Sequence, residues 1–371
     1  MNISIALATY NGERWLREQL DSLARQTLLP CELVISDDQS SDDTLVVIRE
    51  FAATSPFPVR VVQNDIRRGF ADNFMNALRH CVGDAVAYCD QDDVWDPLKL
   101  ERCISAMSTD PTATLVLHDC EEVTADLSPL GIILRAKSSP ASDPAEGRRR
   151  VIRHPALGCC MLLHRRVVDA VLRYWPESHL RYTTRSHSRG ALGHDTVAVH
   201  LAAVLGRVVY LFDSLVQHRR HSQNTWSPDL TSVLSPTPPK FEARIAMLWE
   251  NARTAAIASA MFKEMSERAA DAGDAKATRY LERLADRDLK SARFFAGRAK
   301  LYGTRSRLAR LARFSKMLRA GAYTGLGGAL ASGRCAFKDL AFACLGPAAP
   351  VLLEKVRSQL RLDFHPQELI R

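Results

Sequence analysis

The chain has 371 residues, is 46% hydrophobic and 25% charged, and carries a formal net charge of +8. These values are those of an ordinary globular protein with room for two domains. The sequence contains no run of 18 apolar residues, the length that would indicate a membrane span. The basic balance favours an acidic partner, namely nucleic acid, an anionic lipid surface or a phosphorylated substrate.

The N-terminus lacks a basic stretch followed by a long apolar one, so we expect no secretory signal. The nine cysteines form no C-x-x-C pair and show no zinc-ligand spacing, and most lie in apolar surroundings. We therefore expect free, buried, reduced thiols in a cytoplasmic protein.

The first 107 residues alternate between strand-like and helix-like patterns. Strands are predicted at 3–7, 31–36, 59–64 and 85–89, where short apolar runs stand between polar clusters. Helices are predicted at 11–26, 41–52, 70–82 and 96–107, where apolar residues recur at helical spacing. This alternation predicts an α/β fold with a doubly wound, mostly parallel, Rossmann-like sheet.

Further strands are predicted at 113–120, 158–165 and 207–221, and a further helix at 194–206. The segment 121–150 is predicted to be a mobile loop, as is the His- and Arg-rich stretch at 176–192.

A domain boundary is predicted where four prolines fall within residues 227–239. We expect a catalytic domain at 1–226, a Pro-rich linker at 227–239 and a basic α-helical region at 240–371. From 287 to 319 that region has eleven Lys or Arg residues and one acid, Asp288.

The sequence DQDD at 90–93 ends the fourth predicted strand. Side chains two apart in an extended segment point the same way, so Asp90 and Asp92 can converge. Crowded carboxylates are stable around a divalent cation, and oxygen ligands favour Mg²⁺ or Mn²⁺. For Asp93 and Asp96, capping of the next helix is an equally simple explanation.

Three other polar clusters are weaker signals when taken alone. In SDDQSSDD, 36–43, one carboxylate could contact a base or ribose, or the cluster could cap a helix. In GHD, 193–195, Asp195 could be a general base or an N-terminal cap. In QHRRHSQN, 217–224, His could bind the metal and Arg a diphosphate, or the stretch could be a solvated basic strand end.

Taken in order, these stretches resemble the family-two inverting glycosyltransferases, which have the GT-A fold. The matching residues are SIALATYNGERWLREQLDSLARQT, ELVISDDQSSDDT, NFMNALRHCVGDAVAYCDQDDVWDPLKL, GHD and HRRHSQN, within roughly 2–226. The resemblance is to a branch with rhamnosyl- and galactosyltransferases of bacterial surface polysaccharide. It implies a GT-A-type sheet, with the basic helices as a C-terminal extension.

The resemblance also implies roles for individual residues. It assigns nucleotide contacts to Ala8, Thr9, Tyr10, Asp38 and Asp90, and metal binding to Asp92, Asp90 and His221. It makes Asp195 the catalytic base and Arg219 or Arg220 a phosphate clamp. Two departures from the pattern, QHRRH at 217–221 and HDT at 194–196, leave open which arginine acts and how the acceptor pocket is shaped.

The implied reaction is metal-dependent, inverting transfer from a UDP- or dTDP-sugar to a glycan or lipid-linked glycan. The implied location is cytoplasmic, and the basic helices add the expectation of a peripheral position on the anionic inner face of the membrane. The first competing interpretation is a sugar-phosphate nucleotidyltransferase, although its usual Gly-rich N-terminal loop is missing. A second is a non-catalytic nucleic-acid- or membrane-binding protein, but no nucleic-acid motif is present and we expect no nucleic-acid partner. A third is a degenerate transferase that binds donor without turnover.

Overall fold

The computed structural model describes residues 1–136, 150–154, 156–176, 193–222, 224, 241–323 and 333–346. The chain divides into two compact units. The first contains the sheet and its helices together with residues 265–278, and the second contains the rest of the C-terminal helices. The predicted Pro-rich linker at 227–239 lies outside the described residues.

Strands and helices alternate along the first unit as predicted. The strands are β1 (Ile3–Thr9), β2 (Glu32–Asp37), β3 (Val59–Gln63), β4 (Ala85–Cys89), β5 (Val94–Trp95), β6 (Ala113–Val123), β7 (Pro129–Ala136), β8 (Arg150–His154), β9 (Met161–His164) and β10 (Arg207–Arg219). The helices are α1 (Glu13–Ala24), α2 (Thr44–Thr54), α3 (Phe70–His80), α4 (Lys99–Ser108), the 3₁₀ turn η2 (Gly158–Cys160), α5 (Arg165–Tyr174) and α6 (His194–Leu205).

The strands join in one sheet with the order β3-β2-β1-β4-β9-β6-β10-β5, and β7 and β8 extend from β6. Strands β1, β2, β3 and β4 are parallel. Because β4 and β6 are both antiparallel to β9, they run in the same direction, and β10 is parallel to β6. The carboxyl ends of β1, β2, β4 and β10 therefore meet at one edge, together with the start of β9.

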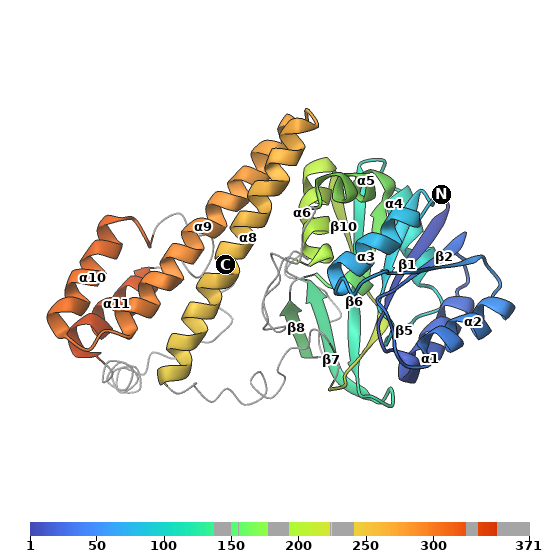
Figure 1. Ribbon diagram of the computed structural model, residues 1–371, viewed down its shortest axis with the longest axis horizontal. Coiled ribbons are helices and arrows are strands. Elements are labelled where there is room, and N and C mark those ends of the chain that lie inside the picture. The colour runs from blue at the N-terminus through green and yellow to red at the C-terminus, as the bar shows by residue number, and fades with distance from the viewer. Residues whose placement is uncertain are drawn as a thin grey trace. The chain divides into compact units, whose positions relative to one another are not determined.

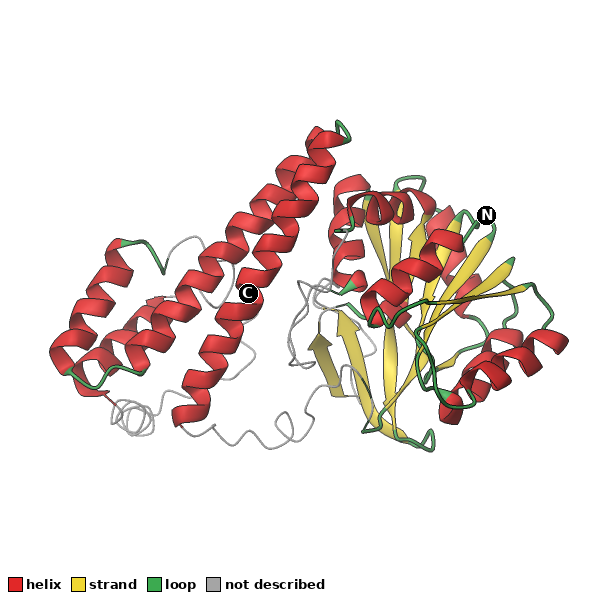
Figure 2. Cartoon of the chain, in the orientation of Figure 1, coloured by secondary structure: helices red, strands yellow, loops and turns green. Residues whose placement is uncertain are grey.

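Helices cover both faces of this sheet (Figures 1 and 2). Successive right-handed crossovers from β1 to β2 to β3 place α1 and α2 on one face, where they contact each other. The return from β3 to β4 places α3 on the opposite face, where it contacts α5 and α6. Strands β1, β2 and β4 are buried by these two layers, which explains their nearly continuous apolar sequences. The predicted doubly wound α/β fold is confirmed.

Several sequence predictions in the middle of the chain were wrong. Strand β7 occupies Pro129–Ala136, inside the segment predicted to be a mobile loop. Its early Pro129 and Gly131, the latter at φ +67°, resemble turn residues, while Ile132–Leu134 pair with β6. Helix α5 and strand β5 were not predicted, and the predicted strand at 158–165 is a 3₁₀ turn followed by β9.

The second unit is helical, as predicted for the C-terminal region. The described C-terminal helices are α8 (Phe241–Asp271), α9 (Ala275–Tyr302), α10 (Arg307–Arg319) and α11 (Gly333–Leu345), of which the end of α8 and the start of α9 belong to the first unit. A small core forms around Phe294, Phe314 and Phe342. Within the described ranges, no helix is both long and apolar enough to cross a membrane.

A buried carboxylate organises this helical unit. Asp339 is 0% exposed, and its two oxygens accept hydrogen bonds from the Arg298 guanidinium and from the hydroxyls of Tyr302 and Tyr323. Since a buried charge is tolerated only when it is paired and hydrogen-bonded, these contacts fix α11 against α9.

None of the nine cysteines, all of which the structure describes, forms a disulfide, as predicted. Six are buried, whereas Cys31, Cys335 and Cys344 are half-buried.

Candidate functional site

The loop after β1 carries three of the predicted nucleotide contacts. Ala8 is half-buried, and Thr9 is buried with its hydroxyl donating to Asp37 Oδ1 at 2.9 Å. Tyr10 is half-buried, and the Arg67 guanidinium lies 3.8 Å from its ring centroid. An aromatic ring with a cation on its face is a chemically suitable surface for a base and a phosphate.

A reciprocal amide clamp joins this loop to the loop after β4, residues 90–93, which we call the acidic loop. Gln91 Oε1 accepts from Tyr10 N at 2.8 Å, and Gln91 Nε2 donates to Tyr10 O at 3.0 Å. The clamp lies against Gly12, where an added Cβ would stand 2.4 Å from Gln91 Oε1. The two loops are thereby held at one spacing.

Asp38 is almost fully buried and its carboxylate is used inside the protein. It accepts from the backbone of Arg68 at 2.6 Å and Gly69 at 2.8 Å, and from Asn64 Nδ2 at 2.9 Å. These contacts shape the loop that carries Arg67 to Tyr10. A direct contact of Asp38 with nucleotide stays a prediction, and the structure gives this residue an organising role as well.

The acidic loop separates its three carboxylates into different environments. Asp90 is half-buried, and burial followed by the charges of Asp93 and Asp92 raises its pKa well above the usual range. Asp92 Oδ2 lies 2.9 Å from His221 Nε2. Asp93 is 1% exposed, and burial raises its pKa to about 6. Asp92 and His221, which the resemblance assigns to metal binding, therefore lie side by side across 129 residues of sequence, and their metal role stays a prediction.

The Asp92–His221 pair fits a divalent cation. Two neighbouring ligands of an octahedral Mg²⁺ or Mn²⁺ ion stand roughly 3 Å apart, since each metal–ligand bond is about 2.1 Å. The 2.9 Å between Asp92 Oδ2 and His221 Nε2 matches that separation. Asp90 in the same loop offers a further carboxylate.

Asp195 lies in the first turn of α6, and its Oδ1 accepts from Thr196 N at 2.6 Å. Burial raises its pKa to about 6, while the Thr196 hydrogen bonds oppose that rise. Burial and the charges of Asp93 and Asp92 are the main causes of the raised pKa of Asp90, and the charge of Asp195 adds to them. The N-cap of α6 is Gly193 and no described side chain caps this helix, so the capping interpretation of Asp195 was wrong, and its role as catalytic base stays a prediction.

The two predicted phosphate-binding arginines have different surroundings. Arg219 is 1% exposed, and its guanidinium donates to Asp92 O at 2.8 Å, to Ala125 O at 2.6 Å and to Glu18 Oε2. Arg220 is more open, with 17% of its side chain exposed, and its Nε lies 3.1 Å from Glu122. Arg219 therefore supports the acidic loop, and Arg220 is the better placed of the two to meet a ligand.

Two contributing residues were missed by sequence reasoning. Trp15 on α1 stacks on the His221 ring with centroids 5.3 Å apart, and the Arg219 guanidinium lies 4.6 Å from the Trp15 ring. His218 contacts the buried Glu122 at 3.1 Å. Although burial opposes it, Asp93 and Glu122 raise the pKa of His218 to about 9. The position of Trp15, four residues after ATYN, was the signal in the sequence that could have identified it.

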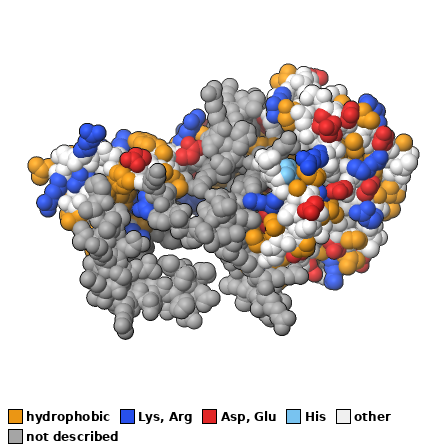
Figure 3. Space-filling model, turned by 90° about the horizontal axis from the view of Figure 1, so that it is seen from below, with side chains coloured by type: hydrophobic (Ala, Val, Ile, Leu, Met, Phe, Trp, Pro, Cys, Tyr) orange, Lys and Arg blue, Asp and Glu red, His pale blue; other side chains and the backbone are white. Residues whose placement is uncertain are grey.

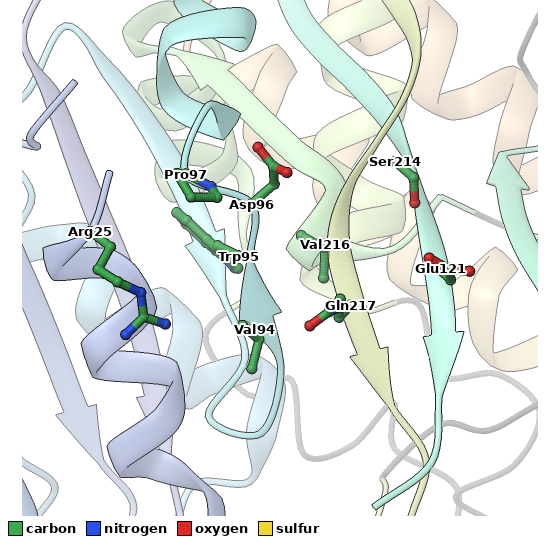
Figure 4. A pocket seen from close by; sticks show the side chains of 9 residues that line it. All are labelled: Arg25, Val94, Trp95, Asp96, Pro97, Glu121, Ser214, Val216 and Gln217. Atoms are coloured by element: carbon green, nitrogen blue, oxygen red, sulfur yellow. The ribbon is translucent and has the colours of Figure 1, made fainter. Parts of the chain in front are cut away.

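A pocket of about 370 Å³ lies beside the acidic loop rather than within it (Figure 4). It is lined by Arg25, Val94, Trp95, Asp96, Pro97, Glu121, Ser214, Val216 and Gln217. None of the predicted site residues is among these. Asp96 accepts from Leu98 N at 2.9 Å in the turn before α4, which agrees with its predicted role at the helix start.

Comparison with known families was made on the whole chain. The model of the family described as "Glycosyl transferase family 2" matches residues 4–172. This match includes the loops after β1, β2 and β4, and it agrees with the predicted resemblance rather than with a nucleotidyltransferase.

Curated relatives match over shorter segments. The chain is 36% identical to an uncharacterised protein of Mycobacterium tuberculosis over 126 residues, 33% of this chain and 36% of that protein. It is 33% identical over 105 residues to the Escherichia coli UDP-Glc:alpha-D-GlcNAc-diphosphoundecaprenol beta-1,3-glucosyltransferase WfgD, covering 28% of this chain and 40% of that protein. The chain thus spans little more than a third of the length of the first of these relatives.

Solved structures with a similar chain course have low sequence identity. One is S. aureus TarS 1-349 in complex with UDP-GlcNAc, at 15% identity and a TM-score of 0.47, covering 86% of this chain and 88% of that chain. Another is the mannosyltransferase PcManGT from Pyrobaculum calidifontis in complex with GDP-Man and Mn²⁺, at 17% identity and a TM-score of 0.42, covering 94% and 86%.

Proposed function

We propose that the protein transfers a sugar from a UDP- or dTDP-sugar to a hydroxyl of a glycan or lipid-linked glycan, with inversion, on the premise that residues 4–172 match the model of glycosyl transferase family 2. The observation that carries the proposal is the shared edge of the sheet. There, Asp92 Oδ2 of the acidic loop lies 2.9 Å from Nε2 of His221, which follows β10, and the charge of Asp195 acts on Asp90.

The donor is proposed to lie across the two clamped loops. Ala8, Thr9 and Tyr10 would contact the base, with Arg67 on the exposed side of Tyr10. Asp90 would contact the ribose or the cation, and Arg220 would contact the diphosphate. Asp92 and His221 would hold a divalent ion, which, when bound, neutralises negative charge on the departing diphosphate.

Asp195 is proposed as the catalytic base. Its carboxylate takes the proton of the acceptor hydroxyl, while the acceptor oxygen forms a bond to the anomeric carbon. The bond from that carbon to the diphosphate oxygen breaks on the opposite side, so the configuration inverts and the nucleoside diphosphate leaves. A pKa of about 6 leaves most of the carboxylate ionised at pH 7 and still basic enough to accept a proton.

Nucleotide binding gives the direct test of this proposal. We expect UDP or dTDP to raise the thermal unfolding temperature by several degrees with Mn²⁺ present and by much less without it. At a nucleotide concentration 100 times Kd, binding stabilises the folded protein by about 2.7 kcal/mol. Asp92→Asn should remove the Mn²⁺ dependence. Equal responses with and without Mn²⁺ in the wild-type protein would exclude the metal-dependent mode of binding.

The proposal extends to the basic helices, which we place on an anionic membrane surface. Several large apolar side chains of α10 and α11 are exposed, including Leu308 at 81% and Phe337 at 60%. Figure 3 shows hydrophobic and basic side chains next to one another on the second unit. A surface of this composition suits an interface that contains lipid tails and anionic headgroups.

Vesicle flotation tests this placement. The wild-type protein should float with phosphatidylglycerol vesicles and not with phosphatidylcholine vesicles, and high salt should release it. The triple variant Arg313→Glu, Lys316→Glu, Arg319→Glu should lose binding. A matched triple variant of exposed arginines in the first unit, Arg49→Glu, Arg79→Glu, Arg102→Glu, should keep it. Equal loss in both variants would mean that only net charge matters.

A further inference from the structure

A second group of potential metal ligands lies beside the Asp92–His221 pair. One carboxylate oxygen each from Asp90 and Asp93 and the Sγ of Cys159 lie within 4.8 Å of one another. They meet because β9 runs antiparallel to β4, so that the turn η2 before β9 stands at the carboxyl end of β4. The backbone of this turn is held in place because the buried Lys99 ammonium donates to Cys159 O.

The Asp93 carboxylate has one oxygen that a cation could bind. Its side chain is 1% exposed, and Oδ1 accepts from Arg219 N at 3.1 Å. Oδ2 is buried and meets no donor at hydrogen-bonding geometry among the residues that the structure describes, and the side chain that donates to this carboxylate is the Cys159 thiol, whose proton a bound cation would replace. A buried carboxylate oxygen without a donor is costly, and a bound cation would remove that cost. Asp90, which is half-buried, leaves a route of entry.

The chemistry of the three ligands selects the class of ion. A thiolate with two carboxylates suits a borderline-soft cation such as Zn²⁺ and not Mg²⁺, which prefers oxygen ligands. In a tetrahedral zinc site, neighbouring ligand atoms stand roughly 3.5 Å apart, given Zn–O and Zn–S bonds of about 2.1 and 2.3 Å. Ligand atoms within 4.8 Å of one another need only small side-chain rotations to reach that spacing.

We propose that Asp90, Asp93 and Cys159 form a binding site for a thiophilic divalent cation of the zinc class, separate from the Asp92–His221 pair. Three protein ligands leave one position open, as in zinc sites that also bind a water or a second ligand. The inference does not rest on sugar transfer, because it concerns the binding of the ion alone. Since Asp90 belongs to both groups, filling this site would withdraw Asp90 from the proposed donor site.

Cobalt spectroscopy on the full, reduced and metal-free chain tests the proposal. One equivalent of Co²⁺ should produce a sulfur-to-cobalt charge-transfer band in the near ultraviolet, which Zn²⁺ abolishes and excess Mg²⁺ does not. Cys159→Ser should lose the band. Cys160→Ser is the matched control, because Cys160 is the next residue, is equally buried at 3% exposed and faces Cys120, and it should keep the band.

A second measurement uses only the wild-type protein, so it stays informative if the Cys159→Ser protein folds poorly. Zinc-edge X-ray absorption of the wild-type protein with one equivalent of Zn²⁺ should show one sulfur at about 2.3 Å and otherwise oxygen or nitrogen ligands. The proposal is overturned by a zinc shell without sulfur or with several sulfurs. It is equally overturned by absence of the cobalt band, or by a band that survives in Cys159→Ser and disappears in Cys160→Ser.

Discussion

Asp195→Asn is expected to lower kcat/KM for sugar transfer by about 10²- to 10⁴-fold, while the Kd for UDP or dTDP stays nearly unchanged. The amide has almost the shape of the carboxylate and can still accept from Thr196 N, so the start of α6 should keep its structure. It cannot take a proton from the acceptor. The measurement pairs steady-state kinetics with calorimetric titration of the nucleoside diphosphate.

The pH dependence of the wild-type enzyme gives an independent check on Asp195. Burial raises the pKa of this carboxyl to about 6, so the active, ionised form predominates above pH 6 and is lost as the pH falls through that value. We expect kcat/KM to decline below about pH 6 and the residual activity of Asp195→Asn to lack this decline. Asp213→Asn, a change at an exposed acid, should leave the profile as it is. Normal turnover in Asp195→Asn would remove this residue from the base role.

Arg219→Met should destabilise the first unit by about 3–5 kcal/mol, because it removes one partner of a buried, hydrogen-bonded charge. The substitution leaves Asp92 O and Ala125 O without the donors that hold the acidic loop, and it removes one of the two guanidinium groups that lie over the Trp15 ring. Thermal unfolding followed by tryptophan fluorescence suits the measurement, since Trp15 lies beside the change. A fall in Tm of roughly 10 °C is expected for a unit of this size.

Arg17→Met is the matched control for this change. Arg17 also pairs with a glutamate, Glu50 at 2.8 Å, but both side chains are about half exposed. An exposed pair of this kind contributes about 0–1 kcal/mol, so the Tm should hardly move. If Arg219→Met unfolded like Arg17→Met and lost nucleotide affinity instead, Arg219 would be a ligand contact and not a support for the loop.

Local sequence patterns predicted most of the fold of the first unit. Buried parallel strands such as β1, β2 and β4 are short apolar runs, and helices such as α1 and α3 have amphipathic spacing, so both are visible without tertiary contacts. Strand β7 was missed because its pairing with β6 decides its conformation against the turn-like Pro129 and Gly131. Strand β5 has only two residues, too few to show any period.

For the candidate site, the sequence predicted which residues lie at the carboxyl-end edge of the sheet but not which of them contact one another. The carboxyl-end rule placed Asp38, Asp90 and Asp92 on one side of the sheet. It could not separate Arg219, the last residue of β10, from Arg220, which follows it, because adjacent residues of an extended segment point in opposite directions and only the fold shows which one is buried. Nor could it bring Cys159 to Asp93, since that meeting depends on the reversed direction of β9.

The amide clamp of Gln91 fixes the distance between the loop after β1 and the loop after β4. Because both polar atoms of one side chain hold the backbone of Tyr10, the segments on either side move as a single rigid piece. We expect a ligand that contacts both segments to be selected by its length. The spacing that sets this length is held by two hydrogen bonds from a single side chain.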